Sequence, residues 1–381
     1  MDFSLTEDQR IFRESIERVV TDLYPFDKRQ AAVATPKGYL DEHWQQLAEL
    51  GCMAAPFPEA CGGLDGGPIE LMLIAEQFGR GLVTSPYMAT VVLGGHAVLF
   101  AGNEAQRHDI LPQVADGSLK LALAYGERQA RYTLDDVVTT AKPDGDGYVL
   151  AGQKDVVFYA QDADIIVVVA RTSGGQRSRD GLSLFLVPAS VSGLTMTGYG
   201  TQDGSRAANI LLDGVKVGAD ALLGEAGQAC PVLERVIDHA IAFACADAVG
   251  SMWEVYSTTL EYLKTREQFG QTLGSFQALQ HRMVDVYTEC ELAQSTVYEV
   301  TLSLDKDDTV RRQAASSAKF LIGQAARHVG EEGVQLHGGM GMTMDVPLGH
   351  HLKRAMMMNA SFGDMRHHLN LLAQTVRAAA A

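Results

Sequence analysis

The chain has 381 residues, of which 46% are hydrophobic and 20% are charged. This composition is typical of a globular protein, and the length is enough for two or three packed units. The formal net charge of −16 excludes a general nucleic-acid binder, although basic pockets for a nucleotide ligand remain possible.

The cysteines and the N-terminus both indicate a protein of the cell interior. The five cysteines are odd in number and contain no C-x-x-C pair, so we expect a reduced chain and a cytoplasmic location. The first residues lack a basic patch followed by an apolar stretch, so no secretory signal is expected. No apolar run reaches about 18 residues, so no membrane span is expected.

The first third of the chain is predicted to be helical. Thr6-Glu7-Asp8-Gln9 resembles a capping box that opens a helix. A connector rich in glycine and proline is expected at 56–68. Further helices are predicted over 69–79, 87–101 and 104–117.

The pattern changes near residue 120 and predicts a β domain of about 100 residues. The turn Asp144-Gly145-Asp146-Gly147 separates two of its strands. The predicted strands cover 121–125, 148–151, 165–170, 182–187 and 210–212.

The helical period returns at about residue 230. We therefore predict an α+β, mostly helical protein with domains at 1–119, 120–228 and 229–381, the last a bundle of long antiparallel helices. Its clearest apolar stripe consists of Phe276, Leu279, Met283, Val286, Cys290, Ala293 and Val297.

Two motifs carry the chemical signal. Gln335-Leu336-His337-Gly338-Gly339-Met340-Gly341 places three glycines in four positions, which lets a backbone approach a phosphate or a ribose–adenine edge closely. Arg266-Glu267-Gln268-Phe269-Gly270-Gln271 ends a predicted helix with an arginine suited to phosphate. Taken singly, a tight turn and an exposed surface arginine explain them equally well.

Together, 69 residues apart, the two motifs resemble the acyl-CoA dehydrogenase family. Within that family the sequence looks closest to small subunits of pimeloyl-CoA dehydrogenases. The resemblance runs over nearly the whole chain and includes the segments 3–9, 58–64, 76–80, 152–154 and 211–217.

The resemblance implies an N-terminal helical domain, a central β domain and a C-terminal four-helix bundle. It implies FAD as cofactor, an acyl-CoA substrate as in fatty acid degradation, an electron-transfer flavoprotein as acceptor, and a dimer or dimer of dimers. Arg266 would hold the pyrophosphate of the neighbouring subunit's FAD. Phe269, Gln335, Gly338 and Gly339 belong to the same cofactor-binding segments.

The position of the family's catalytic base is altered. Counting from Arg354 places Gly363, or with one gap Phe362, where most members have a glutamate, and a second subgroup's position is occupied by Ala240. None of these can take a proton. The nearby carboxylates that remain as candidate bases are Asp364 and Asp247, although an exposed or capping aspartate is the simpler interpretation of each.

The flavin-facing segments also differ from the family pattern. Val156-Val157-Phe158 replaces Trp-Ile-Thr, and 125–131 replaces a loop with threonine and serine donors. Three hypotheses stay open: an active dehydrogenase, a non-catalytic partner subunit that completes a neighbour's FAD site in a hetero-oligomer, or an acyl-CoA- or flavin-binding protein. Adjacent histidines at 350–351 and 367–368 point about 100° apart on a helix, so no metal site is expected.

Overall fold

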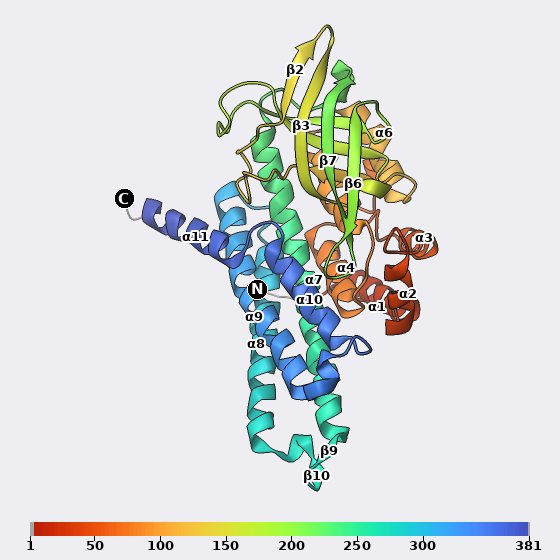
Figure 1. The fold of residues 1–381 in the computed structure, drawn as a ribbon, viewed down its shortest axis with the longest axis vertical. Helices are drawn as coiled ribbons and strands as arrows, with labels where there is room; N and C mark the ends of the chain where they lie inside the picture. Colours follow the sequence, from red (N-terminus) through yellow and green to blue (C-terminus); the bar gives the residue numbers. More distant parts are fainter. Residues whose placement is uncertain (1–3, 380–381) are drawn as a thin grey trace. The chain divides into compact units, whose positions relative to one another are not determined.

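The computed structural model describes residues 4–379 (Figure 1). The chain divides into two compact units that do not follow chain order. One, the helical unit, combines 1–31, 68–83 and 241–381, and the other, the sheet unit, combines 32–67 and 84–240. The division into domains at 119 and 228 remains a prediction.

The helical unit is built around α9, which packs against α8, α10 and α11. α8 and α9 run side by side as a long antiparallel hairpin (Figure 1). The helices that lie wholly in this unit are α1 (Glu7–Leu23), α4 (Pro68–Arg80), α8 (Gln277–Thr301), α9 (Asp308–His337), α10 (Leu348–Ala360) and α11 (Met365–Ala379). α2 (Phe26–Ala34) and the long α7 (Ala229–Thr265) extend over both sets of residues, and the turns η5 (Leu273–Ser275) and η6 (Gly338–Met342) complete the unit.

Local sequence explains how the first helix begins. The Thr6 side chain accepts from the amide of Gln9, and the Gln9 side chain accepts from the amide of Thr6, so the predicted capping box is confirmed. In α8, Met283, Val286, Cys290, Ala293 and Val297 of the predicted stripe are buried.

Two glycines let α4 and α7 touch backbone to backbone. A Cβ at Gly79 would lie 1.8 Å from the carbonyl oxygen of Asp247, and a Cβ at Gly250 would lie 1.9 Å from that of Glu76. No other residue type fits such a crossing. This close contact fixes the position, relative to α4, of the segment of α7 that carries Asp247.

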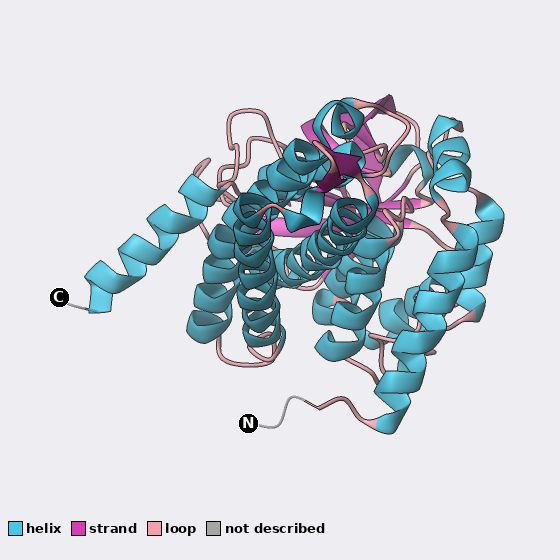
Figure 2. Cartoon of the chain, turned by 90° about the horizontal axis from the view of Figure 1, so that it is seen from below, coloured by secondary structure: helices cyan, strands magenta, loops and turns pink. Residues whose placement is uncertain are grey.

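The sheet unit holds one eight-stranded, mostly antiparallel sheet in the order β6-β7-β3-β2-β4-β5-β8, with β1 pairing in parallel with β4. Figure 2 shows that strands gather in one region while helices make up most of the chain. The strands are β1 (Leu121–Ala124), β2 (Thr140–Asp144), β3 (Gly147–Phe158), β4 (Ile165–Arg171), β5 (Leu182–Pro188), β6 (Leu194–Gly200), β7 (Arg206–Val217) and β8 (Leu222–Leu223). The other elements are α3 (Asp41–Glu49), η1 (Glu59–Cys61), η2 (Met88–Gly95), α5 (His96–Ala101), α6 (Glu104–Ala115), η3 (Ala160–Asp162) and η4 (Ala219–Ala221).

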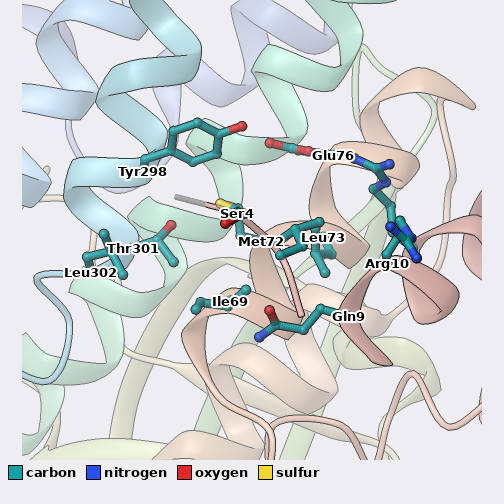
Figure 3. Close-up of a pocket in the computed structure, with 12 residues that line it drawn as sticks. Ser4, Gln9, Arg10, Ile69, Met72, Leu73, Glu76, Tyr298, Thr301 and Leu302 are labelled. Carbon is teal, nitrogen blue, oxygen red and sulfur yellow. The ribbon is translucent and has the colours of Figure 1, made fainter. Parts of the chain in front are cut away.

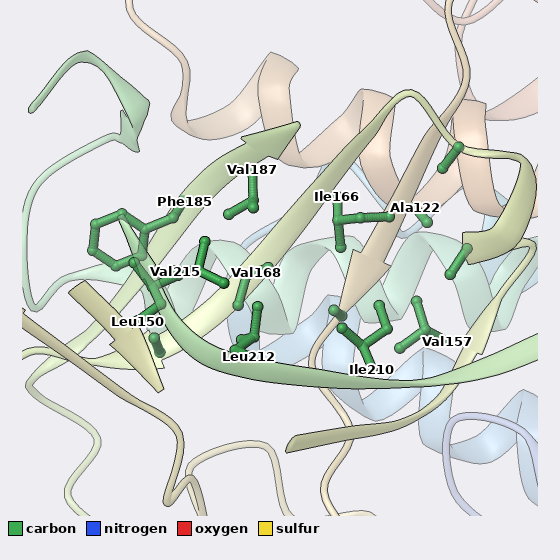
Figure 4. Close-up of a cluster of buried hydrophobic side chains, with 14 of the residues drawn as sticks. Ala122, Leu150, Val157, Ile166, Val168, Phe185, Val187, Ile210, Leu212 and Val215 are labelled. Atoms are coloured by element: carbon green, nitrogen blue, oxygen red, sulfur yellow. The ribbon is translucent and has the colours of Figure 1, made fainter. Parts of the chain in front are cut away.

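One hydrophobic core cluster of the sheet unit lies on the face of the sheet where Ile166, Val168, Phe185, Ile210 and Leu212 converge (Figure 4). The other face of β4 and β5 is buried as well. All five predicted strands are present, but β2, β6 and the two-residue β8 were not predicted. Helix 87–101 also differs from the prediction, because its first part, Met88–Gly95, is a π-helix.

Candidate functional site

The end of α7 presents an arginine and an aromatic ring to solvent. β9 (Glu267–Gln268) and β10 (Gln271–Thr272) form a short hairpin whose loop residues Phe269 and Gly270 have φ of 55° and 81°. Positive φ at both loop positions is what a tight two-residue hairpin requires. Phe269 is 90% exposed, and within 4–379 the guanidinium of the exposed Arg266 has no hydrogen-bond or ion-pair partner. The charge of Arg266 is therefore available to a ligand.

The end of α9 presents bare backbone. α9 stops at His337, and Gly338 follows with φ of 58°. A Cβ built on Gly338 or Gly339 would meet nothing within 4 Å, so open space lies in front of this corner. Gln335, one turn earlier, is also exposed. A ligand can approach this corner closely because glycines carry no side chain.

A ring stack joins the two segments at one end of the bundle. The rings of Tyr262 and His337 lie 4.1 Å apart at an angle of 22°, and Nδ1 of His337 is 2.9 Å from the carbonyl oxygen of Gly333. Leu263 and Leu336 belong to one buried cluster. The structure thus brings the ends of α7 and α9 together, one turn before Arg266 and directly before Gly338. An unpaired arginine and exposed glycine backbone are the groups that a pyrophosphate and adenosine, the adenine half of FAD, would need.

Asp247 is engaged in a buried ion pair. Its carboxylate accepts two hydrogen bonds from Arg354, at 2.9 Å from Nε and 2.8 Å from Nη2, and its side chain is 7% exposed. Nη2 of Arg354 also donates to the carbonyl oxygen of Val83 at 2.9 Å. These two hydrogen bonds link α7, which carries Asp247, to α10, which carries Arg354, so Asp247 has a structural role.

Asp364 is a helix cap. It is exposed, and its Oδ1 accepts from the amide of His367 at 2.8 Å in the first turn of α11. A carboxylate in this place satisfies an otherwise unpaired amide and favours the helix N-terminus. Asp364 therefore has a structural role at the start of α11.

A buried lysine, Lys319, donates hydrogen bonds to the turn that carries Gly363. The buried ammonium of Lys319 donates to the carbonyl oxygens of Met358, Asn359 and Gly363 at 2.6, 3.1 and 2.8 Å. Burial lowers the pKa of this ammonium to about 8. Sequence reasoning missed Lys319, since the only signal for it would be a lysine on the apolar face of α9.

The space where a side chain at 363 would stand is occupied. Gly363 has φ of 110°, and a Cβ there would lie 2.5 Å from Nε2 of His368 and 2.7 Å from Cδ2 of His367. His368 in turn lies 3.0 Å from the carbonyl oxygen of Phe362. Ala240, the alternative base position, has no exposed surface. Both positions are therefore closed to a carboxylate.

In the sheet unit, the segment expected beside a flavin has its own hydrogen bonds. Val156 has φ of 55° and is 51% exposed, and its amide donates to Oδ1 of Asn209 at 3.2 Å. The Asp155 amide donates to Gly126 at 2.9 Å. Two backbone amides that could have replaced the missing threonine and serine donors are thus already in use.

A buried ion pair fixes the loop at 125–131. Nζ of Lys154 lies 2.7 Å from Oε1 of Glu127, and the two side chains are 0% and 2% exposed. Burial lowers the pKa of Lys154 to about 8. Burial alone would raise the pKa of Glu127, but the charge of Lys154 and the amides of Val138 and Thr139 hold it below its ordinary value.

Comparison with known proteins identifies the class. Models of the acyl-CoA dehydrogenase N-terminal, middle and C-terminal domains match residues 6–118, 122–214 and 230–376. The chain therefore belongs to the acyl-CoA dehydrogenase family, whose members are flavoprotein oxidoreductases, and the predicted fold is confirmed.

Relatives resemble the chain over most of its length. YngJ of Bacillus subtilis, a probable acyl-CoA dehydrogenase, is 30% identical, over 95% of this chain and 96% of that protein. CarC of Acetobacterium woodii, a subunit of the caffeyl-CoA reductase–Etf complex, is 27% identical over 87% of each chain. The solved structure of the Tcur3481-Tcur3483 steroid ACAD is 29% identical with a TM-score of 0.88, covering 98% of this chain and 99% of that one.

The histidines and the longer helices were the remaining features with a possible functional meaning. Among residues 4–379, no group of three or more His, Cys, Asp or Glu side chains is placed to hold a metal ion. The histidine pairs have other contacts: Nδ1 of His351, for example, lies 2.6 Å from Oγ of Ser251. None of the helices in the described part of the chain is long and apolar enough to cross a membrane.

Proposed function

We propose that this chain is a subunit of an FAD-dependent acyl-CoA dehydrogenase and that it completes the FAD site of a neighbouring subunit without acting as the base itself. One contrast carries the proposal. The arginine and glycines expected at a neighbour's cofactor are free, whereas Asp247 forms an ion pair and Asp364 caps a helix.

The reaction of the assembly would be α,β-dehydrogenation of an acyl-CoA thioester to the trans-2-enoyl-CoA. Bound FAD would supply the hydride acceptor for the β-hydrogen. The part of this chain is to bind: Arg266 neutralises the pyrophosphate, and Gly338 and Gly339 allow the adenosine half to approach the backbone. An electron-transfer flavoprotein is the acceptor that the likeness to CarC supports.

The partner in this proposal is a second acyl-CoA dehydrogenase chain that carries a competent base. The likeness to the Tcur3481-Tcur3483 steroid ACAD, whose name joins two components, supports a hetero-oligomer. The flavin-facing changes at Val156 support it as well, because the chain's own flavin site lacks the expected donors. A homo-oligomer is the competing arrangement.

A second candidate function is dehydrogenation by this chain alone. It has one observation in its favour: Asp364 is exposed and directly follows Gly363, the position of the family's glutamate. In that case Asp364 would leave its capping role and take the α-proton.

Retention of FAD tests the binding role. The Arg266→Gln variant should lose FAD about 10- to 150-fold more readily than the parent, because a hydrogen bond to a charged group contributes about 1.5–3 kcal/mol. Lys264→Gln is the matched control, since Lys264 lies nearby but pairs with Glu261. The FAD-to-chain ratio after dialysis gives the answer, and equal retention in both variants would refute the assignment.

Flavin bleaching tests the catalytic role. The purified, FAD-loaded chain should be bleached slowly under anaerobic conditions by straight-chain, branched and dicarboxylic acyl-CoAs. A positioned general base contributes about 10²–10⁴-fold, so its absence is large enough to see. Rapid bleaching that Asp364→Asn abolishes would overturn the supporting role and establish the second candidate.

A further inference from the structure

A cleft of about 430 Å³ opens in the helical unit between the start of α1, the first turns of α4 and the end of α8 (Figure 3). This volume lies within the range of about 300–1,000 Å³ that small-molecule sites occupy. None of the residues assigned above to FAD or considered as bases lines it. The cleft therefore has no part in the function proposed above.

The wall of the cleft is apolar on one side. Ile69, Met72 and Leu73 from α4 face it, together with Leu302 at the end of α8. In Figure 3, Met72 and Leu73 lie in the middle of the view, with Ile69 below them and Leu302 to the left. Leu302 is 42% exposed, so apolar surface in the cleft is open to solvent rather than closed by the protein. A bound alkyl chain would cover it.

The opposite side is polar and carries an arginine without a partner. Arg10 pairs with Glu7, one turn earlier on α1. Arg13 also lines the cleft and is half-buried, but among residues 4–379 its guanidinium makes no hydrogen bond and no ion pair. A half-buried arginine that the fold leaves unpaired retains all five N–H donors for a ligand.

A carboxyl group completes the polar side. The Glu76 side chain accepts from Nε2 of Gln294, and Figure 3 shows Glu76 and the Tyr298 hydroxyl pointing toward one another at the upper rim. Burial raises the pKa of Glu76, although the hydrogen bond from Gln294 and the charges of Arg80 and Arg13 oppose the shift. The polar side of the cleft thus holds the carboxyl group of Glu76 as well as the guanidinium of Arg13.

We propose that this cleft binds a carboxylate with an alkyl body of medium chain length, its head on Arg13 and its tail along Met72 and Leu73. A carboxylate fits better than a phosphate because one planar guanidinium matches two carboxylate oxygens, whereas the cleft offers one free arginine and no second free cation among the residues that line it. In a chain with a net charge of −16, this free positive charge in an apolar cleft selects an amphipathic anion.

Calorimetric titration of the full-length, FAD-loaded protein with octanoate tests the proposal. Octanoate should bind once per chain with a Kd below about 1 mM, while acetate, which has no tail, and octanol, which has no charge, should each bind at least 10-fold more weakly. Arg13→Gln should weaken octanoate binding at least 10-fold, and Arg13→Lys should weaken it less. Arg18→Gln is the matched control, on the same helix but outside the cleft.

The position of the ligand is read independently from methionine. Of the 14 methionines, Met72 lines the cleft, so octanoate should shift the ¹³C-methyl signal that Met72→Leu removes. Absence of saturable binding would overturn the proposal. So would equal affinity in Arg13→Gln and Arg18→Gln, or a shift confined to the exposed Met340, Met342 and Met344.

Discussion

Replacing Asp247 by asparagine separates a structural from a catalytic role for this residue. The change keeps the shape of the side chain but removes the carboxylate charge that pairs with Arg354, whose side chain is 14% exposed. Breaking a buried ion pair by removing one partner costs about 3–5 kcal/mol. An unfolding entropy of about 2.1 cal/mol/K per residue then converts ~4 kcal/mol into a loss of about 5 °C in Tm if the chain melts cooperatively.

Differential scanning calorimetry measures this loss, and two further variants sharpen it. Glu261→Gln breaks an exposed pair with Lys264, 67% and 57% exposed, and should cost less than about 1 kcal/mol. The double variant Asp247→Leu with Arg354→Met should recover most of the Tm, because apolar residues that replace both partners of a buried pair are often neutral or stabilising. The structural role would be refuted by an Asp247→Asn protein that keeps its Tm but no longer bleaches with acyl-CoA.

Three further outcomes are expected. Gly250→Ala should destabilise the protein by about 3 kcal/mol or more, because its Cβ would overlap the Glu76 carbonyl oxygen at 1.9 Å; Gly67→Ala, with open space around it, should be near neutral in the same melt. Burial lowers the pKa of His351 to about 3, so the contribution of His351 to stability is complete above its unfolded pKa of about 6.5 and is lost as pH falls toward 3. His351→Gln should therefore flatten the fall of Tm between pH 6.5 and 4, whereas the surface variant His108→Gln should not. Gly363→Glu should lower Tm and should not restore rapid bleaching, because φ is 110° and the histidines at 367 and 368 fill the space; fast bleaching in this variant would contradict the geometry.

Local patterns predicted what local physics determines. The capping box at Thr6, the hairpin turn at 144–147 and the buried stripe of α8 follow from neighbours in sequence. β2 and β6 were missed for the same reason. β2 contains Pro143 and three exposed positions, and β6 contains two glycines and is largely exposed, so neither shows the alternation of a half-buried strand.

Pairings between residues far apart in the chain could not be predicted from the sequence. Asp247 and Arg354 are 107 positions apart, and nothing near either residue indicates that they meet. The same holds for Glu127 and Lys154, a pair that only the fold of the sheet unit brings together. Counting along the chain identified which positions had lost a glutamate, but whether a nearby aspartate could replace it depended on these unseen partners.

The distribution of paired and unpaired charge is the strongest argument about function. A buried charge is costly, so a fold compensates it internally wherever it has only a structural purpose. Asp247 and Glu127 are both compensated in this way, at 2.8 and 2.7 Å from their partners. Arg266 is exposed, so the fold does not need to compensate its charge, and within the described residues its guanidinium has no hydrogen-bond or ion-pair partner. An exposed arginine without a partner, together with carboxylates near the base position that form an ion pair or cap a helix, supports the proposal that this chain assists chemistry performed by a neighbouring subunit.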